Sequence, residues 1–252
     1  MKRTHQPTRL RPVTGIWPVW ASQIGPTGVA TIALVLATAG MGLTAPGDPG
    51  NGVREARSST AASMPDGVPV SLRDVGEHGE LVYDAAKVRD WSKTTADLAK
   101  LKAAAQRLRI DLRESPDELA EVLAALEAAV TTKDKQATMR QANRVTLIAA
   151  NMTVPFHPAV PSDVTRLDYL GRELEIWAEA KDAAKLHTTA VDLTRTWESV
   201  RPAVESRGAT ALSKEFTDLV TRVRSARSPN EFRRLASRVL EAVDRLESVF
   251  RK

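Results

Sequence analysis

A regular spacing of apolar residues is the feature that most constrains the fold of this chain. Between residues 183 and 204 the apolar side chains recur at steps of three and four, which places them on one face of an α-helix. Such a face predicts an amphipathic helix that packs against neighbours. The same period recurs in six further stretches: 88–112, 119–130, 142–152, 167–177, 212–226 and 232–250.

No stretch alternates between apolar and polar residues as a half-buried strand does. We therefore predict an all-α fold, an antiparallel bundle of six to seven helices formed by residues 80–252. Trp91, Trp177 and Trp197 lie on the apolar faces and are expected in the core. A Ser-Pro-x-Glu sequence starts two of the helices, at Ser115 and Ser228, which indicates either an internal duplication or the same helix start used twice.

The N-terminal 45 residues have the composition of a targeting segment. Lys2, Arg3, Arg9 and Arg11 precede an uncharged run of apolar and small residues at 28–45. This order is typical of a signal peptide that is cleaved. It also fits a single N-terminal membrane anchor, a transmembrane helix that stays attached with its basic end in the cytoplasm. Both alternatives predict an extracytoplasmic domain, either anchored to the cytoplasmic membrane or secreted or periplasmic.

Residues 46–79 separate this segment from the predicted bundle. They contain six glycines and four prolines, a composition that predicts a flexible linker. The sequence GEHGE at 76–80 falls at its end and is expected to form a solvated loop, because one histidine with two carboxylates supplies too few fixed ligands for a metal.

The formal net charge of +5 raises the question of nucleic-acid binding. Residues 1–45 carry four basic residues and no acidic one, which leaves a net charge of +1 for residues 46–252. Nucleic-acid binders usually concentrate positive charge on the folded domain. We therefore expect no nucleic-acid partner; the expected partners are the membrane, through the N-terminal segment, and a protein of the cell envelope.

The stretch RLDYLGRELEIW at 166–177 holds the candidate site. Leu167, Leu170, Leu174 and Trp177 form its buried face, and Gly171 beside them suggests close approach of another helix. The predicted helix at 142–152 carries Arg144, and the proline-rich loop at 154–161 that follows this helix carries His157. We interpret these polar residues either as a network that fixes helix register or as a ligand-binding site made of Arg144, His157, Arg166, Asp168, Arg172 and Glu173.

The sequence shows no catalytic constellation. It has no cysteine, and it lacks the G-x-S-x-G, H-E-x-x-H, P-loop and G-x-G-x-x-G motifs. We therefore predict no catalytic residue, no metal, no cofactor and no enzyme activity. The predicted function is a binding or structural accessory role at the cell envelope. Two alternatives are a small-ligand or metal-binding accessory protein for uptake and a hydrolase whose site has no recognised motif.

Overall fold

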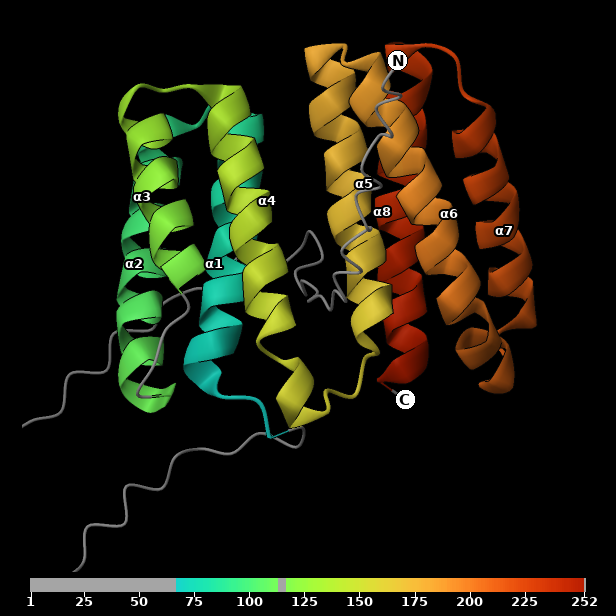
Figure 1. Ribbon diagram of the computed structural model, residues 1–252, viewed down its shortest axis with the longest axis horizontal. Coiled ribbons are helices and arrows are strands. Elements are labelled where there is room, and N and C mark those ends of the chain that lie inside the picture. Colours follow the sequence, from blue (N-terminus) through green and yellow to red (C-terminus); the bar gives the residue numbers. More distant parts are fainter. Residues whose placement is uncertain (1–66, 113–116, 252) are drawn as a thin grey trace, which may run out of the picture. The chain divides into compact units, whose positions relative to one another are not determined.

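The computed structural model describes residues 67–112 and 117–251, and within these ranges every regular element is helical. The predicted all-α fold is therefore confirmed, although the described residues form eight α-helices and one short 3-10 helix (Figure 1), more than the six to seven expected. The elements are α1 Val70–Lys87, α2 Trp91–Leu112, α3 Asp117–Thr131, α4 Lys135–Asn151, η1 Val154–Phe156, α5 Ser162–Ala180, α6 Ala183–Ser206, α7 Thr210–Ser225 and α8 Pro229–Phe250.

The additional helix is α1, which ends at a turn that the spacing of apolar residues does not reveal. The chain turns between α1 and α2 at Arg89, whose φ of 61° is left-handed, and the amide of Asp90 donates to the carbonyl of Ala85. Val88 falls in this turn and is 74% exposed, so its predicted place on a buried face is wrong. Trp91, at the start of α2, is half-buried rather than in the core.

The predicted linker is wrong for residues 70–79, which form the first half of α1. Gly76 and Gly79 are buried in this helix. A Cβ atom on Gly79 would lie 3.0 Å from the Cγ2 of Thr146, so the missing side chain lets α1 approach α4 closely. Gly79 therefore serves helix packing, and GEHGE is helical rather than a loop.

Two hydrophobic cores organise the described helices. One is formed by α1–α4, where α1 packs on α2 and α4, and α3 packs on α4. The other is formed by α5–α8, where α5 packs on α6 and α8, and α7 packs on α6 and α8. Trp197 is buried in the second core with its ring centroid 4.6 Å from that of Phe216.

Gly171 of α5 has the role that its position predicts. A Cβ atom there would lie 2.7 Å from Cδ2 of Leu240 on α8, so the glycine allows the two helices to meet closely. Ile176 and Trp177 of α5 pack against the α1–α4 core, and α4 contacts α5. α5 therefore contacts helices of both cores, and its polar side chains can reach partners in either one.

The predicted N-terminal segment, residues 1–45, and most of the predicted linker lie outside the described residues, as does the first Ser-Pro-x-Glu start at Ser115. Among the helices of residues 67–112 and 117–251, none combines the length and the apolar composition that a membrane crossing requires.

Candidate functional site

Arg172 lies at the centre of a buried group of charged side chains. It extends from α5, is 6% exposed, and donates from Nε to Oδ2 of Asp168 at 2.9 Å. The two residues are four positions apart, a spacing that places them next to one another on the helix surface. Asp168 is also 6% exposed, and both side chains have therefore lost most of their contact with water.

Helix α1 supplies the other charged partners of Arg172. Glu80 Oε2 lies 3.5 Å from one terminal nitrogen of the guanidinium, and Asp84 Oδ1 lies 3.8 Å from the other. The ring of Tyr83 sits below the guanidinium, 4.9 Å from its central carbon, in cation–π geometry. Burial acts to lower the pKa of Arg172, but the carboxylates of Asp168 and Glu80 raise it above its usual value, so the cation stays charged.

A second contact between α1 and α5 centres on Glu175. Its carboxylate accepts hydrogen bonds from the hydroxyl of Tyr83 at 3.0 Å and from Nζ of Lys87 at 2.7 and 2.8 Å. Tyr83 thus contacts Arg172 with its ring and Glu175 with its hydroxyl. Burial and the nearby carboxylate of Glu175 raise the pKa of Tyr83 well above its usual value, so its hydroxyl acts as a hydrogen-bond donor.

Helix α8 adds further carboxyl groups to the same region. Glu247 is 1% exposed and accepts a hydrogen bond at 2.9 Å from Arg251. Burial raises its pKa to about 9, opposed by Arg251 and assisted by Asp168 and Glu80. Glu247 therefore holds a proton at neutral pH. Burial and Asp168 likewise raise the pKa of Asp244.

We call this group the Arg172 cluster. It joins α1, α5 and α8, and its carboxyl groups outnumber its cations, which is why burial forces some of them toward the protonated form. Every described charged side chain within it faces an opposite charge or a hydrogen-bond donor. Its members are Glu80, Tyr83, Asp84, Lys87, Asp168, Arg172, Glu175, Asp244, Glu247 and Arg251.

Glu173 belongs to a different polar group, although it is next to Arg172 in the sequence. Its carboxylate accepts hydrogen bonds from Asn143 Nδ2 at 3.0 Å and from the indole nitrogen of Trp177 at 2.7 Å. Burial raises its pKa, against the effect of both hydrogen bonds. This group links α4 to α5 and uses the half-buried Trp177, which was expected fully in the core.

Of the other predicted site residues, Arg144 and Arg166 lie near Tyr169 of α5 together with Glu173. Burial and Glu173 raise the pKa of Tyr169, whereas Arg144 and Arg166 act to lower it. Arg144 is exposed and pairs with Glu118 at 2.9 Å. Arg166 is partly buried, and the charges of Asp163 and Asp192 favour its cation against burial. His157 is exposed after η1, with a left-handed φ of 50°. The structure thus brings Asp168 and Arg172 together in the Arg172 cluster and places Arg144, Arg166 and Glu173 near Tyr169.

Sequence reasoning missed most of the Arg172 cluster. Glu80 was the last residue of the predicted solvated loop GEHGE, and Tyr83 and Glu175 are 92 positions apart. One signal was present in α8: Glu247 follows Val243 by four residues and precedes Phe250 by three, so it lies on the apolar face of its helix. A carboxylate at such a position indicates a buried polar contact.

The described residues contain no group of three His, Asp or Glu side chains arranged to hold a metal ion. Within the same ranges, no hydrogen bond joins a histidine side chain to a serine or a carboxylate. The contacts within the Arg172 cluster are charge pairs between packed helices, and its raised pKa values favour proton binding by its carboxyl groups.

Comparison of the chain with protein-family models, with curated proteins and with solved structures finds no match.

Proposed function

We propose that this chain is an extracytoplasmic protein, secreted or held at the cytoplasmic membrane by residues 1–45, whose helices form an antiparallel bundle that acts by binding a partner at the cell envelope. The order of the chain supports export: a basic leader, an uncharged apolar run and a Gly- and Pro-rich stretch precede the helices. In this proposal the helical domain is an accessory module and carries out no reaction.

The main support for a binding role is that the charged side chains of the Arg172 cluster pair with one another. The guanidinium of Arg172 faces Asp168, Glu80 and Asp84, and the ring of Tyr83 covers it. A buried cation with this many partners stabilises one arrangement of helices and leaves no face open to a substrate. The Arg172 cluster therefore stabilises the fold. In this proposal the partner binds to the surface of the helical domain.

The alternative of a small-ligand accessory protein for uptake loses support from the same geometry. Its predicted site requires Arg144, His157 and Arg166 to converge on Asp168 and Arg172. Arg144 and His157 are exposed, and Arg144 pairs with Glu118 instead. A metal-binding version has no described group of ligands to support it.

The location can be tested in intact cells because the chain has no cysteine. A single Ser92→Cys substitution, at an exposed position of α2, introduces one thiol into the full-length protein. An impermeant maleimide should label this thiol in cells whose outer barriers have been opened but whose cytoplasmic membrane is intact. Labelling only after lysis of that membrane would contradict the proposal.

A matched Thr4→Cys variant separates the two forms of export. In an anchored protein this thiol stays in the cytoplasm and is protected until lysis, whereas in a cleaved protein residue 4 is absent from the mature chain. Native mass spectrometry of the full-length protein then tests the role: a stoichiometric small molecule or metal would contradict an accessory module that binds a macromolecule through its surface.

A further inference from the structure

The positive charge of the helical domain is concentrated at one place, the turn between α7 and α8. Residues 222–238 contain six arginines and one acidic residue, a net charge of +5, equal to the formal net charge of the whole chain. The remainder of residues 46–252 is therefore net negative. We call this the arginine surface; its members are Arg222, Arg224, Arg227, Arg233, Arg234 and Arg238.

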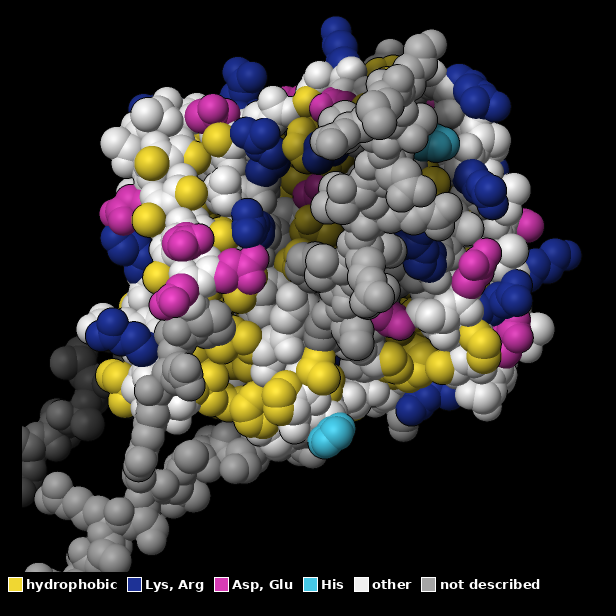
Figure 2. Space-filling view, viewed as in Figure 1, with side chains coloured by type: hydrophobic (Ala, Val, Ile, Leu, Met, Phe, Trp, Pro, Cys, Tyr) yellow, Lys and Arg dark blue, Asp and Glu magenta, His cyan; other side chains and the backbone are white. Residues whose placement is uncertain are grey.

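The side chains of the arginine surface are available for contact. All six arginines are exposed, and none forms an ion pair with another described residue. The single acid within the segment, Glu231, accepts a hydrogen bond from the backbone of Arg227 at the start of α8. Figure 2 shows Lys and Arg side chains along its right-hand side, where α6 and α7 lie in Figure 1, interspersed with acidic ones.

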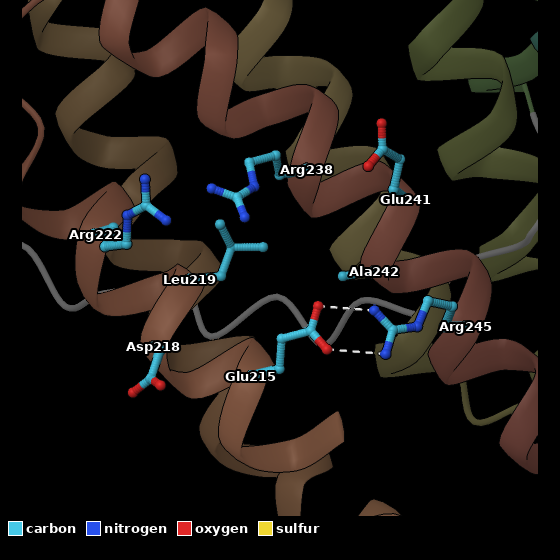
Figure 3. Close-up of a pocket in the computed structure, with 8 residues that line it drawn as sticks. All are labelled: Glu215, Asp218, Leu219, Arg222, Arg238, Glu241, Ala242 and Arg245. Atoms are coloured by element: carbon cyan, nitrogen blue, oxygen red, sulfur yellow. Dashed lines mark hydrogen bonds and ion pairs between the residues drawn. The ribbon is translucent and has the colours of Figure 1, made fainter. Parts of the chain in front are cut away.

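A hollow of about 200 Å³ opens between α7 and α8 beside these arginines. Figure 3 shows Arg222 and Arg238 extending toward one another above Leu219, while the carboxylates of Asp218 and Glu241 point away. The one carboxylate that faces inward, Glu215, is held by both terminal nitrogens of Arg245 at 2.7 and 2.8 Å. The hollow therefore presents two guanidinium groups that form no described ion pair, although the charge of Arg238 acts on Glu215.

Arginine is suited to phosphate recognition. Its planar guanidinium binds two oxygens at once and is weakly hydrated, so a cluster of arginines favours phosphate groups. Like charges held close together also repel, and a bound anion relieves that repulsion. Two arginines line one hollow and four more are exposed within residues 222–238, which fits a layer of phosphates better than a single free anion.

We propose that the arginine surface docks the helical domain onto an anionic phospholipid bilayer, with the hollow between Arg222 and Arg238 receiving a lipid phosphate. Basic clusters bind anionic membrane surfaces with an attraction that grows with each Lys or Arg and is screened by salt. The proposal rests on the proposed function for the presence of a nearby membrane. Single-stranded nucleic acid fits less well, because no aromatic side chain is among the large hydrophobic residues exposed in the described part of the chain.

A local reporter separates docking from insertion of the N-terminal segment. The full-length protein carries a single Ser237→Cys substitution, at an exposed position of α8, labelled with an environment-sensitive dye. It is incorporated into phosphatidylcholine vesicles with or without phosphatidylglycerol. The dye should shift its emission only in the vesicles with phosphatidylglycerol, and the shift should disappear in high salt.

Charge reversal tests which residues cause the shift. Combined Arg224→Glu, Arg227→Glu, Arg233→Glu and Arg234→Glu substitutions should lower the affinity for anionic vesicles by about tenfold or more. The control reverses four exposed cations elsewhere, Arg89, Arg109, Lys133 and Lys214, which changes the net charge equally. An equal loss in both variants, or an equal shift on neutral vesicles, would overturn the proposal. Circular dichroism verifies that both variants fold.

The source of the phosphate is tested in parallel. Arg222→Gln with Arg238→Gln should weaken the dye response, and inorganic phosphate should compete with vesicles only weakly. Tight binding of inorganic phosphate alone, or of short duplex DNA in preference to vesicles, would overturn the lipid assignment. To separate this inference from the export proposal, Leu34→Asp with Leu36→Asp interrupts the apolar run: insertion should be lost, while docking on anionic vesicles should persist.

Discussion

Arg172 and the arginines at the α7–α8 turn are the same residue type in opposite surroundings. Arg172 is 6% exposed and has carboxylates from two helices within 4 Å, whereas the six arginines of the arginine surface are exposed and have no described ion pair. The first arrangement fixes helices to one another. The second presents charge to the outside. The comparison shows that the position of acidic residues, more than the number of arginines, distinguishes a buried, paired cation from cations that face solvent.

The strongest test of this comparison is removal of the buried cation. Arg172→Leu leaves Asp168 and Glu80 buried without it, and we expect the free energy of unfolding to fall by about 3–5 kcal/mol, measured by urea denaturation. Arg144→Leu is the matched control, since its pair with Glu118 is exposed and is worth about 0–1 kcal/mol.

A double variant shows whether the penalty comes from the unpaired charge. Asp168→Leu with Arg172→Leu removes both partners, and it should recover part of the loss because apolar side chains pack in their place. A cost of Arg172→Leu no larger than that of Arg144→Leu would contradict a structural role for the Arg172 cluster.

The next effect in size is a dependence of stability on pH. The pKa of Glu247 rises from an ordinary 4.5 to about 9 on folding, so the folded state binds more protons than the unfolded state between these values. Stability should therefore fall as pH rises through this window, at up to about 1.4 kcal/mol per pH unit for this residue. Asp168 and Asp244, whose pKa values are also raised, act in the same direction.

Thermal unfolding at several pH values measures this dependence. Glu247→Gln, which mimics the protonated form, should flatten the curve and raise stability at the alkaline end. Glu215→Gln is a suitable comparison, because this exposed carboxylate has its pKa lowered by a hydrogen bond from Arg245. A pH profile unchanged by Glu247→Gln would contradict the assignment of a buried protonated carboxyl.

The smallest expected effect on stability comes from the arginine surface. Arg233→Glu with Arg234→Glu should change the free energy of unfolding by less than about 0.5 kcal/mol, since exposed positions away from packed features tolerate substitution. Denaturation by urea checks this value. A loss comparable with that of Arg172→Leu would show that these arginines are structural and would remove the distinction between the two regions.

Much of the helical architecture follows from local patterns in the sequence. The stepwise spacing of apolar residues predicts α6 and its buried Trp197, and Gly208 with φ of 78° ends that helix as expected. Ser228 caps α8 through the amide of Glu231, as the Ser-Pro-x-Glu start predicts. Asp168 and Arg172 pair because helical neighbours four residues apart are close in any context.

The composition of the first half of α1 resembles that of a linker, so the start of this helix was not predicted. Gly76 and Gly79 are typical of a linker, but a missing side chain also allows helices to pack closely, and the contact of Gly79 with α4 shows the second role. The same ambiguity applies to the candidate site. Arg144 and His157 have the chemistry of ligand-binding residues, but their helix face and loop place them in solvent.

The sequence by itself determined the helical class of the described residues, several helix ends and the apolar face of most helices, because these depend on residues within a few positions of one another. The tertiary structure decided which charged residues meet. A carboxylate at the edge of an apolar face has the same local pattern whether water or another helix covers it, and Tyr83 and Glu175 meet across 92 positions of sequence. Burial then changes the charge states of these groups, since the cost of removing an ion from water depends on everything packed around it.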